Sequence, residues 1–340
     1  MYASLGKVAL LQLDAVVNQA ILGLVTREDL AARDFLRWWL EFMQGHVVML
    51  SSSNTQDNLN ADKVRNMPLL VPTLREQLQI VAFLNRETTR IDALVAKKER
   101  LMELLREQRT TLITRAVTMG LEPNTAMKDS GVEWLGEIPA HWDVKKWRYC
   151  CHVTEGQVAP DKDRYRDRIM IAPNHIESGT GRLLFTETAD EQGAISGKYL
   201  VEPGDLIYSK IRPALNKACI ATGYWLCSAD MYPVKVTTTD LHSRYLLYFI
   251  LSEPFVRLMV DESMRVAMPK VNREQLAVCP LVIPPLLEQN AIVAHLDRET
   301  ARIDALIAKV REAIDLLEEL RTALISAAVT GKIDVREEVA

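Results

Sequence analysis

The sequence predicts an α+β protein in which mixed α/β domains alternate with two long α-helices that pair as an antiparallel coiled coil. The main support is an internal repeat of 48 residues without gaps, which starts at Val71 and again at Ile283. Both copies contain the pattern RET-x-RIDAL, at residues 86–94 and 298–306. Chance does not produce a match of this length, so the sequence indicates a duplicated unit of domain plus helix.

Each copy of the repeat has the composition of one long helix. Residues 74–119 and 286–330 contain neither Gly nor Pro and are rich in good helix formers. We expect the helices to bury their apolar stripes against each other; the alternative is that each packs only on its own globular domain. In the second copy the stripe recurs at three- or four-residue steps and consists of Ile303, Leu306, Val310, Ile314, Leu317, Leu320 and Leu324.

Weaker similarity extends upstream of both helices. The segment DLAARDFLRWWL from Asp29 resembles DLHSRYLLYFIL from Asp240, and LNADKVRNMPLLVP from Leu59 resembles VNREQLAVCPLVIP from Val271. Between residues 143 and 283 the second unit also contains short β-rich runs such as RIMIAP, GDLIYSK and YPVKVTT, separated by turn signals. The globular part of the unit is therefore predicted to mix strands and helices.

Bulk properties restrict the class of protein. A net charge of −4 argues against a protein that coats DNA through overall positive charge, although a local groove can still be basic. The five cysteines form no CxxC pair, which favours reduced thiols. No apolar run approaches the roughly 18–20 residues of a membrane span, and no signal peptide is evident, so we expect a cytoplasmic protein with no membrane partner.

Several motifs together resemble one known family. GVEWLGEIPAHWDV (131–144) resembles the opening of a target-recognition domain in type I restriction–modification specificity subunits. GDLIYSKIRPALNK (204–217) resembles a strand and loop of those domains, and the segment from Pro280 to the RIDAL pattern resembles their strand-to-helix junction. The resemblance covers essentially the whole chain.

The resemblance implies a non-catalytic subunit of a phage-defence system. Two target-recognition domains would each read half of a split site in double-stranded DNA, while the long helices would set the spacing and dock methyltransferase (M) subunits. Restriction (R) subunits would join the larger complex. This chain would hold no cofactor or metal, because S-adenosylmethionine, ATP and Mg²⁺ would act on the partner subunits. A helix of this length spans roughly 65–70 Å, enough to separate two readers by one to two DNA turns of about 34–36 Å.

The two repeat units are unequal, because the first lacks counterparts of roughly 70 residues that follow Trp142 in the second. We therefore expect a first recognition domain truncated at its N-terminus, with pairing to a second half-subunit or self-association as a further possibility. The expected division is the C-terminal part of the first recognition domain (1–73), the first helix (74–119), a linker (120–130), the complete second recognition domain (131–285), the second helix (286–331) and a tail (332–340).

Candidate DNA contacts are cations and amides near turns, because Lys and Arg bind phosphates while Arg, Asn and Gln read base edges. Each group has the alternative of being an ordinary solvated loop. The strongest group is Tyr208, Ser209, Lys210, Arg212, Asn216 and Lys217. Three weaker groups are Lys162, Arg164 and Arg166, near Arg168; Asn174, His175 and Arg182; and Lys270 and Asn272, with Arg265 nearby. The fourth group has a counterpart in Thr55, Gln56, Asn58 and Asn60.

Motifs of catalysis are absent from the sequence. It contains no Asn/Asp-Pro-Pro-aromatic methyltransferase loop, phosphate loop or Cys/His metal spacing. Carboxylates on the long helices are interpreted as a solvated face, and Glu76-Gln77 and Glu288-Gln289 as residues that serve the helix starts. Two other functions remain open: a coiled-coil scaffold with impaired DNA binding, and a nuclease with an unfamiliar site.

Overall fold

The computed structural model describes residues 6–18, 21–51, 61–263 and 269–336, with the side chains of residues 48–51 left aside. The chain divides into two compact units. Unit 1 comprises Met1–Glu103 and Ile307–Ala340, and unit 2 comprises Leu104–Leu306. Each unit is considered by itself below.

Two long helices are present, as the repeat predicts. Helix α4 spans Leu74–Met119 and α9 spans Leu286–Val329. A capping box opens α4, in which Thr73 N and Oγ1 donate to Glu76 and Glu76 N donates to Thr73 Oγ1. Gly120 follows α4 in the left-handed region, at φ +78°, where a residue without Cβ ends a helix at little cost.

Segments of both long helices contribute to each unit, and within each unit they run antiparallel. In unit 1, Ile80 and Leu84 share a core cluster with Ile325 and Val329. In unit 2, Ile113 and Val117 share a cluster with Ile292 and Leu296. The predicted apolar stripe is only partly buried: Ile303 and Ile314 are covered, whereas Leu306 and Leu320 are exposed. The helices therefore pair through fewer positions than the stripe suggests.

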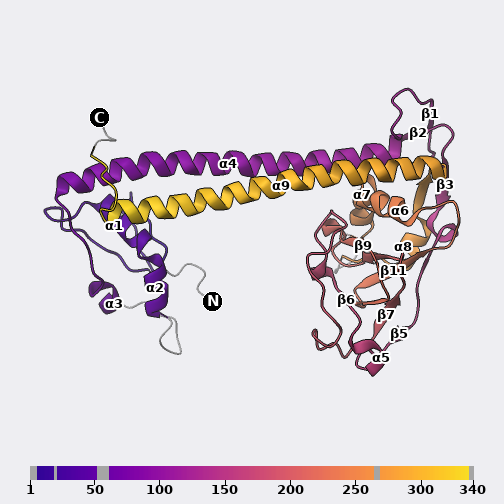
Figure 1. Cartoon of the computed structure of the whole chain (residues 1–340), viewed down its shortest axis with the longest axis horizontal. Coiled ribbons are helices and arrows are strands. Elements are labelled where there is room, and N and C mark those ends of the chain that lie inside the picture. The colour runs from indigo at the N-terminus through magenta and orange to yellow at the C-terminus, as the bar shows by residue number, and fades with distance from the viewer. Residues whose placement is uncertain (1–5, 19–20, 52–60, 264–268, 337–340) are drawn as a thin grey trace. The chain divides into compact units, whose positions relative to one another are not determined.

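Unit 1 is built from helices. Alongside the long-helix segments lie α1 (Arg33–Phe42), α2 (Gln44–Ser51) and α3 (Ala61–Arg65). Phe35, Trp38 and Trp39 of α1 enter the same cluster as residues from the start of α4 and the end of α9. Figure 1 shows α1 next to these helix ends. These aromatic side chains supply much of the apolar area that unit 1 buries.

The described residues between 6 and 32 of unit 1 form turns and irregular chain and no regular strand. Many of their large apolar side chains are exposed. They are Val8, Leu10, Leu11, Leu13, Val16, Val17, Ile21, Leu22, Leu24, Val25 and Leu30. The first repeat unit thus leaves apolar surface uncovered that a sheet would bury.

Unit 2 contains the strands. Two four-stranded sheets have the orders β5-β7-β10-β6 and β4-β11-β8-β9, and two strand pairs, β1-β2 and β12-β3, complete it. The bounds are β1 Met127–Asp129, β2 Glu137–Pro139, β3 Asp143–Lys146, β4 Cys151–Val153, β5 Gln157–Val158, β6 Met170–Ile171, β7 Lys198–Val201, β8 Leu206–Ser209, β9 Ala218–Ile220, β10 Trp225–Cys227, β11 Met231–Val236 and β12 Pro280–Ile283.

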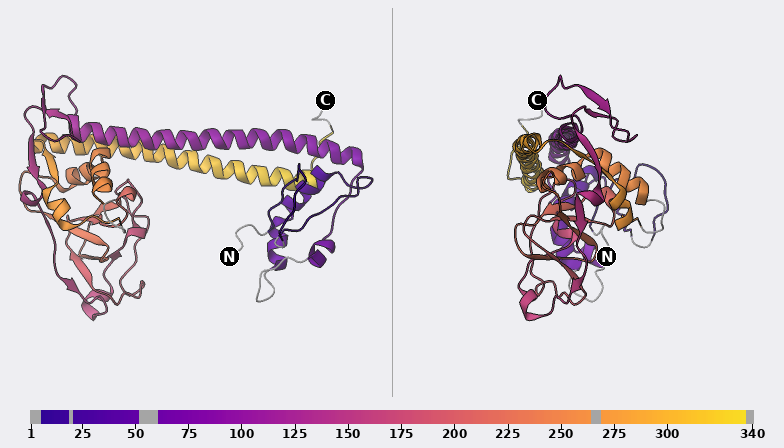
Figure 2. Two further views of the ribbon diagram at one scale, coloured as in Figure 1. Left: turned by 180° about the vertical axis from the view of Figure 1, so that it is seen from behind. Right: turned by 90° about the vertical axis from the view of Figure 1, so that its right-hand side faces the viewer.

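Helices α6 (Ser243–Leu251) and α7 (Glu253–Ser263) lie between the long-helix segments and the sheets of unit 2 (Figure 2). Tyr245 of α6 reaches the carbonyl oxygens of Val117 on α4 and Val282 on β12. The short helices α5 (Asp163–Arg166) and α8 (Arg273–Val278) and the 3₁₀ turns η1 (Trp147–Tyr149), η2 (Pro173–His175) and η3 (Pro213–Leu215) complete the unit. The mixed α and β architecture confirms the predicted fold class.

A buried glutamine joins the start of each long helix to the helix upstream of it. In unit 1, Gln77 Oε1 accepts from Ala32 N, and its Nε2 donates to the carbonyls of Leu30 and Pro72. In unit 2, Gln289 Oε1 accepts from His242 N, and its Nε2 donates to Asp240 and Pro284. The amide thus satisfies three backbone groups, a more specific role than the helix-start function expected from sequence.

This correspondence corrects the upstream alignment by one residue. The sequence match pairs Asp29 with Asp240, whereas the glutamine contacts pair Leu30 with Asp240 and Ala32 with His242. Trp38 and Tyr248, which correspond in the corrected alignment, bind the equivalent residues Asn85 and Asp297. The weak sequence match is therefore shifted by one residue, although it aligns identical residues such as Leu36 with Leu247.

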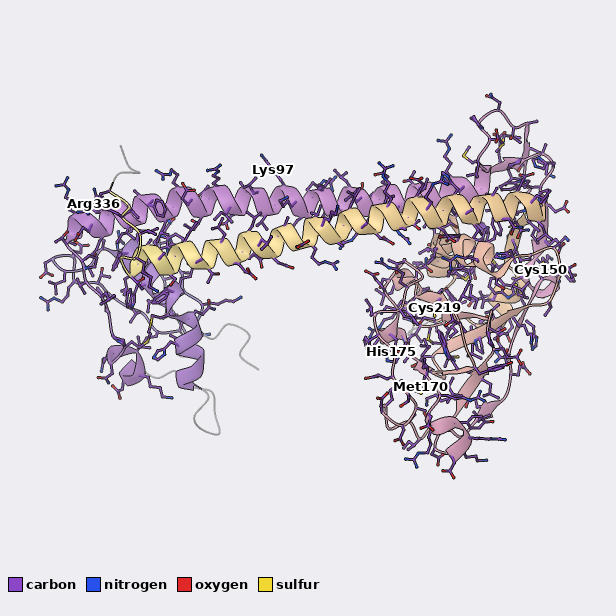
Figure 3. All side chains as sticks on the ribbon, in the orientation of Figure 1. Lys97, Cys150, Met170, His175, Cys219 and Arg336 are labelled. Atoms are coloured by element: carbon purple, nitrogen blue, oxygen red, sulfur yellow. The ribbon has the colours of Figure 1, made fainter. Side chains whose placement is uncertain are left out.

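The five cysteines are free and buried, and Cys150 and Cys219 are marked in Figure 3. Burial raises the pKa of Cys219 and of Cys279 to about 12, so these thiols stay protonated near neutral pH. Among the described residues, no helix is long and apolar enough to cross a membrane.

Candidate nucleic-acid interface

The loop between β8 and β9 carries the strongest predicted group, and its backbone is unusual. Arg212 has φ 48° and Asn216 has φ 41°; within the described part of the chain these are the only residues other than Gly with positive φ. A left-handed conformation costs an Arg residue about 1–2 kcal/mol. Such strain persists only where the surroundings hold it, and it is common at binding sites.

The surroundings do hold this loop. The buried Asn216 donates from Nδ2 to the carbonyl of Ile250, and its own carbonyl accepts from Gly179 N at 3.0 Å. Lys217 Nζ donates to the carbonyl of Pro173 at 2.7 Å. These contacts fix the base of the loop, while Arg212, Ala214 and Leu215 in its middle are exposed.

A second segment, distant in sequence, lies against the loop. Val271 N donates to the carbonyl of Lys210 at 2.8 Å, and Arg212 N donates to that of Pro269 at 3.3 Å. Ile211 and Lys270 form an isolated antiparallel bridge. The structure thereby joins members of the first and fourth predicted groups, which sequence spacing treats as separate.

Three cations gather at this junction, and we call Lys210, Arg212 and Lys270 the cationic edge. Arg212 and Lys270 are exposed, while Lys210 is half-buried with Nζ 5.3 Å from the ring centroid of Tyr232. A small set of cations on adjoining segments suits phosphate binding, and Arg212 can in addition bind guanine with two hydrogen bonds.

The second predicted group lies on and around α5. Lys162 and Arg164 are exposed, and Arg164 stacks over the Tyr165 ring with its Cζ 4.5 Å from the centroid. Arg166 is engaged by Asp190, and the hydrogen bond and charge of that carboxylate raise the pKa of Arg166. Arg168 Cζ lies 6.0 Å from the ring centroid of the exposed Tyr224, an aromatic residue that sequence reasoning did not select.

Four of the predicted residues are buried and make contacts inside the unit. Tyr208 and Ser209 are covered within β8, where burial raises the pKa of Tyr208 and Ser209 Oγ donates to the carbonyl of Ile211. Asn216 is used inside the loop. His175 is fully buried, with Nδ1 accepting from Ala172 N and Nε2 3.2 Å from Glu187 Oε2 (Figure 3). Alternation and turn signals in the sequence reveal neither the burial of a strand on both faces, as for Tyr208 and Ser209, nor the burial of a side chain in a turn or loop, as for His175 and Asn216.

Three further candidates are occupied by structural contacts. Asn272 is the N-cap of α8, where its side chain accepts from Gln275 N. Lys217 binds a carbonyl, as described above, and Arg182 is held by carboxylates. Asn174 lies within η2 and is exposed. Arg265, Thr55, Gln56, Asn58 and Asn60 lie outside the described residues.

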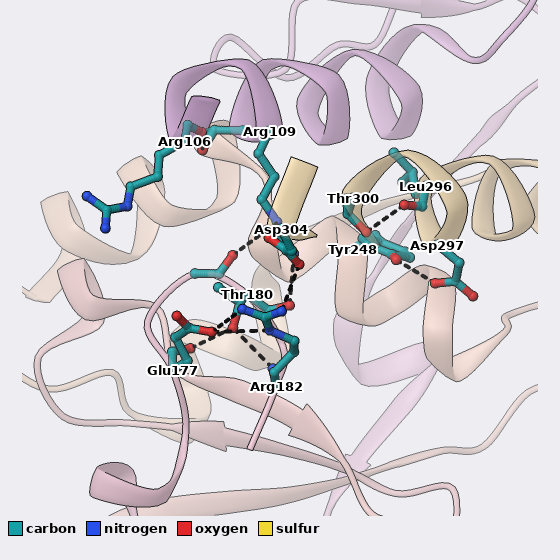
Figure 4. A network of polar contacts seen from close by, with 12 residues as sticks. Arg106, Arg109, Glu177, Thr180, Arg182, Tyr248, Leu296, Asp297, Thr300 and Asp304 are labelled. Atoms are coloured by element: carbon teal, nitrogen blue, oxygen red, sulfur yellow. Dashed lines mark hydrogen bonds and ion pairs between the residues drawn. The ribbon is translucent and has the colours of Figure 1, made fainter. Parts of the chain in front are cut away.

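The carboxylates around Arg182 belong to a polar network that sequence reasoning missed (Figure 4). Arg182 contacts Glu177 at 2.6 Å and Asp304 of α9 at 3.3 Å. Desolvation alone would lower the pKa of Arg182, but the hydrogen bond to Glu177 and the charges of both carboxylates outweigh it and leave that pKa raised. Asp304 also pairs with the buried Arg109 of α4.

This network corrects the interpretation of helix carboxylates as a purely solvated face. Asp304 and its repeat counterpart Asp92 are the aspartates of the two RIDAL patterns, and Arg109 and Arg321 are also equivalent. Arg321 Nε lies 3.1 Å from Asp92, just as Arg109 Nε lies 3.3 Å from Asp304. The pairs could have been recognised from the repeat, because both members recur at matching positions.

The motif at residues 131–144 is bound to the start of α9 through side-chain contacts. Trp142 is fully buried, and its Nε1 donates to Glu288 Oε2 at 2.8 Å. His141 Nε2 lies 2.7 Å from the other oxygen of the same carboxylate. Among the described residues, no three His, Cys, Asp or Glu side chains form a cluster suited to a metal ion.

Known proteins resemble this chain along most of its length. The model of the family described as type I restriction modification DNA specificity domain matches residues 141–316. The type I restriction enzyme EcoDI specificity subunit of Escherichia coli is 26% identical over 315 residues, which are 88% of this chain and 70% of that protein.

Two solved structures match this chain along most of its length, and the first of them agrees with its fold. One, from a study of complex assembly and conformational transition of the type I R-M system, has a TM-score of 0.68 at 16% identity, covering 89% of this chain and 72% of that one. The crystal structure of the HsdS subunit from Thermoanaerobacter tengcongensis gives a TM-score of 0.46 at 18% identity, covering 89% and 71%. At these identities the likeness concerns the fold and not individual contact residues.

Proposed function

The chain belongs to the type I restriction modification DNA specificity domain family, and from this premise we propose that unit 2 reads DNA through its cationic edge. The family role is DNA sequence specificity, and within it the edge would place Lys210 and Lys270 on phosphates and Arg212 at a base edge. Lys162, Arg164 and Arg168 around α5 would add further phosphate contacts.

The single observation that carries this proposal is the junction between the loop of residues 210–217 and residues 269–271. Two segments far apart in sequence bring three cations together, and the strained Arg212 is held there by the backbone. Strain that contributes nothing to the core is expected where a side chain must face a ligand.

We further propose that the DNA target is bipartite and that M subunits dock on the long helices, with R subunits joining the complex. Exposed leucines on the helix segments of unit 1, including Leu94, Leu101, Leu316 and Leu320, support docking, because apolar surface on a helix favours a protein partner. S-adenosylmethionine, ATP and Mg²⁺ would be bound by those partners, so that this chain contributes specificity and no catalysis.

Selection from a random duplex library tests the proposal. The purified chain, together with its M subunit, is expected to enrich one sequence. Joint replacement of Lys210, Arg212 and Lys270 by Ala should abolish the enrichment. It should also make the decrease of log affinity with log salt less steep, by about one unit of slope per lost phosphate contact.

Charge-matched replacement of the exposed Lys128, Lys146 and Arg148 provides the control and should leave both measurements unchanged. Binding of M without any enriched sequence would instead favour the scaffold function. Cleavage of DNA by the chain alone with Mg²⁺ would favour a nuclease. Enrichment that survives loss of the cationic edge would overturn the assignment of these three residues.

A further inference from the structure

We propose that Arg109 is a positioning residue that fixes the DNA-reading loop of unit 2 to the long-helix pair. The inference rests on the proposed function of that loop, but it concerns a residue on α4 that would not itself touch DNA. Arg109 would act through the turn of residues 177–182, which lies between the helix and the loop.

Arg109 makes two hydrogen bonds and one ion pair at the helix end of this connection. Its Nη1 donates to the carbonyl of Gly179 at 2.8 Å and its Nη2 to that of Thr180 at 3.0 Å. Its Nε lies 3.3 Å from Asp304 Oδ1, an ion pair without hydrogen-bond geometry. The side chains of Arg109 and Asp304 are only 7% and 10% exposed, so each requires the other's charge.

The planar guanidinium suits this position. Two successive carbonyl oxygens and one carboxylate surround a single side chain, which a fork of donors can serve at once (Figure 4). An ammonium group would offer a point charge on a flexible stem and could not hold the same two carbonyls in one plane. Lysine is therefore a poor replacement for Arg109.

Gly179 of the turn is hydrogen-bonded both to Arg109 and to the loop of residues 210–217. Gly179 accepts from Arg109 through its carbonyl and donates through its N–H to the carbonyl of Asn216 at 3.0 Å. Gly179 has φ +69°, and Asn216 is itself in the left-handed region. Asp304 strengthens the turn from the other side, because it also binds Arg182. The loop that presents Arg212 is thereby tied to α4 and α9.

The equivalent ion pair in unit 1 distinguishes two roles of Arg109: joining the two long helices and holding the turn of residues 177–182. Arg321 and Asp92 repeat the ion pair between the helices, but their side chains are 28% and 59% exposed. In place of two carbonyls, Arg321 binds Glu41 of α1, with Nη1 2.6 Å from Oε1. Joining the helices is thus common to both pairs, whereas holding the turn before a candidate DNA loop belongs to Arg109.

Hydrogen exchange and DNA binding of Arg109→Met, with Arg321→Met as the matched control, test this proposal. In Arg109→Met, amides of residues 177–182 and 210–217 should exchange faster while the sheets keep their protection. Affinity for the enriched sequence should fall by at least about tenfold relative to scrambled DNA, the size of a base mismatch. The salt slope for scrambled DNA should not change, and Arg321→Met should show neither effect.

Two further variants guard against misfolding. Arg109→Gln keeps a neutral donor and should give an intermediate result, whereas Arg109→Lys should behave like Arg109→Met. The proposal is overturned if the loop exchanges normally in Arg109→Met, if discrimination persists, or if Arg321→Met reproduces both effects. If the wild-type chain enriches no sequence, the proposed function fails; the positioning role is then decided by the exchange data alone.

Discussion

Unit 1 and unit 2 share one helical framework but differ in what covers it. Gln77 and Gln289 make the same three hydrogen bonds, and Arg321–Asp92 repeats Arg109–Asp304. Around this framework unit 2 adds twelve strands, whereas the described part of unit 1 has none. The comparison shows which features a repeat specifies locally and which depend on distant partners.

The segment before each long helix shows the difference most clearly. In unit 2, β12 pairs with β3, and Val282 is 0% exposed. Its repeat counterpart in unit 1, Leu70, is 53% exposed and lies outside any strand. Similarly, Glu288 is bound by His141 and Trp142, whereas Glu76 closes the capping box of its own helix. Nearly equal sequences thus acquire different structures from their surroundings.

The largest expected effect comes from a carboxylate placed at this repeat position. Val282→Asp should lower the free energy of unfolding of unit 2 by about 4 kcal/mol or more, because it buries an unpaired charge. Leu70→Asp should change stability by less than about 0.5 kcal/mol. Urea unfolding of the two variants measures both effects, and equal destabilisation would mean that residues 69–71 are covered after all.

An intermediate effect is expected at the shared glutamines. Gln289→Leu and Gln77→Leu should each cost about 3 kcal/mol, because three backbone groups lose their partner at roughly 1 kcal/mol apiece. Unfolding followed by a probe in each unit would measure these costs. A much smaller cost for Gln77→Leu would mean that water replaces the amide in unit 1, and that the frameworks are less alike than their hydrogen bonds indicate.

The smallest effect concerns pH. Hydrogen bonds from Lys145 and Thr238 lower the pKa of Asp240, which joins the β3 strand to the start of α6. Ionised Asp240 therefore contributes stability that is fully present above the ordinary pKa of about 3.9 and is lost as pH falls through the lowered value. Since both partners are partly exposed, the contribution should stay below about 1 kcal/mol.

Acid titration of Lys145→Met measures that contribution. The variant should lose less stability than the wild type as the pH falls below about 4, since the main cause of the shift is gone. Arg27→Met removes a well-exposed ion pair with Asp29 in unit 1 and should leave the acid profile unchanged. Parallel profiles for Lys145→Met and the wild type would mean that the ion pair of Asp240 with Lys145 contributes no measurable stability.

The sequence was sufficient for features encoded close along the chain. Uninterrupted helix formers predicted α4 and α9, and the repeat predicted that the two units share a framework. It could not predict that Leu69, Leu70 and Val71 stay exposed while Leu281, Val282 and Ile283 are buried, because the covering strand β3 lies far away in sequence.

Only part of the candidate site could be predicted, because the sequence does not show which distant segments adjoin in the fold. Lys210, Arg212 and Lys270 were selected as cations near turns, but only the fold shows that their two segments adjoin. Tyr208 and His175 were selected by the same local pattern and are buried. Arg109 was missed because a charge on a long helix looks solvated unless its partner on the other helix is known.

Sequencing of methylated DNA from cells that carry the chain with its M subunit tests the central claim most directly. The account predicts one methylated motif of two parts separated by an unread spacer. Joint replacement of Lys210, Arg212 and Lys270 by Ala should degrade or abolish that motif, whereas the Lys128, Lys146 and Arg148 control keeps it. An unchanged motif after loss of the three cations would contradict the claim that this edge of unit 2 reads DNA.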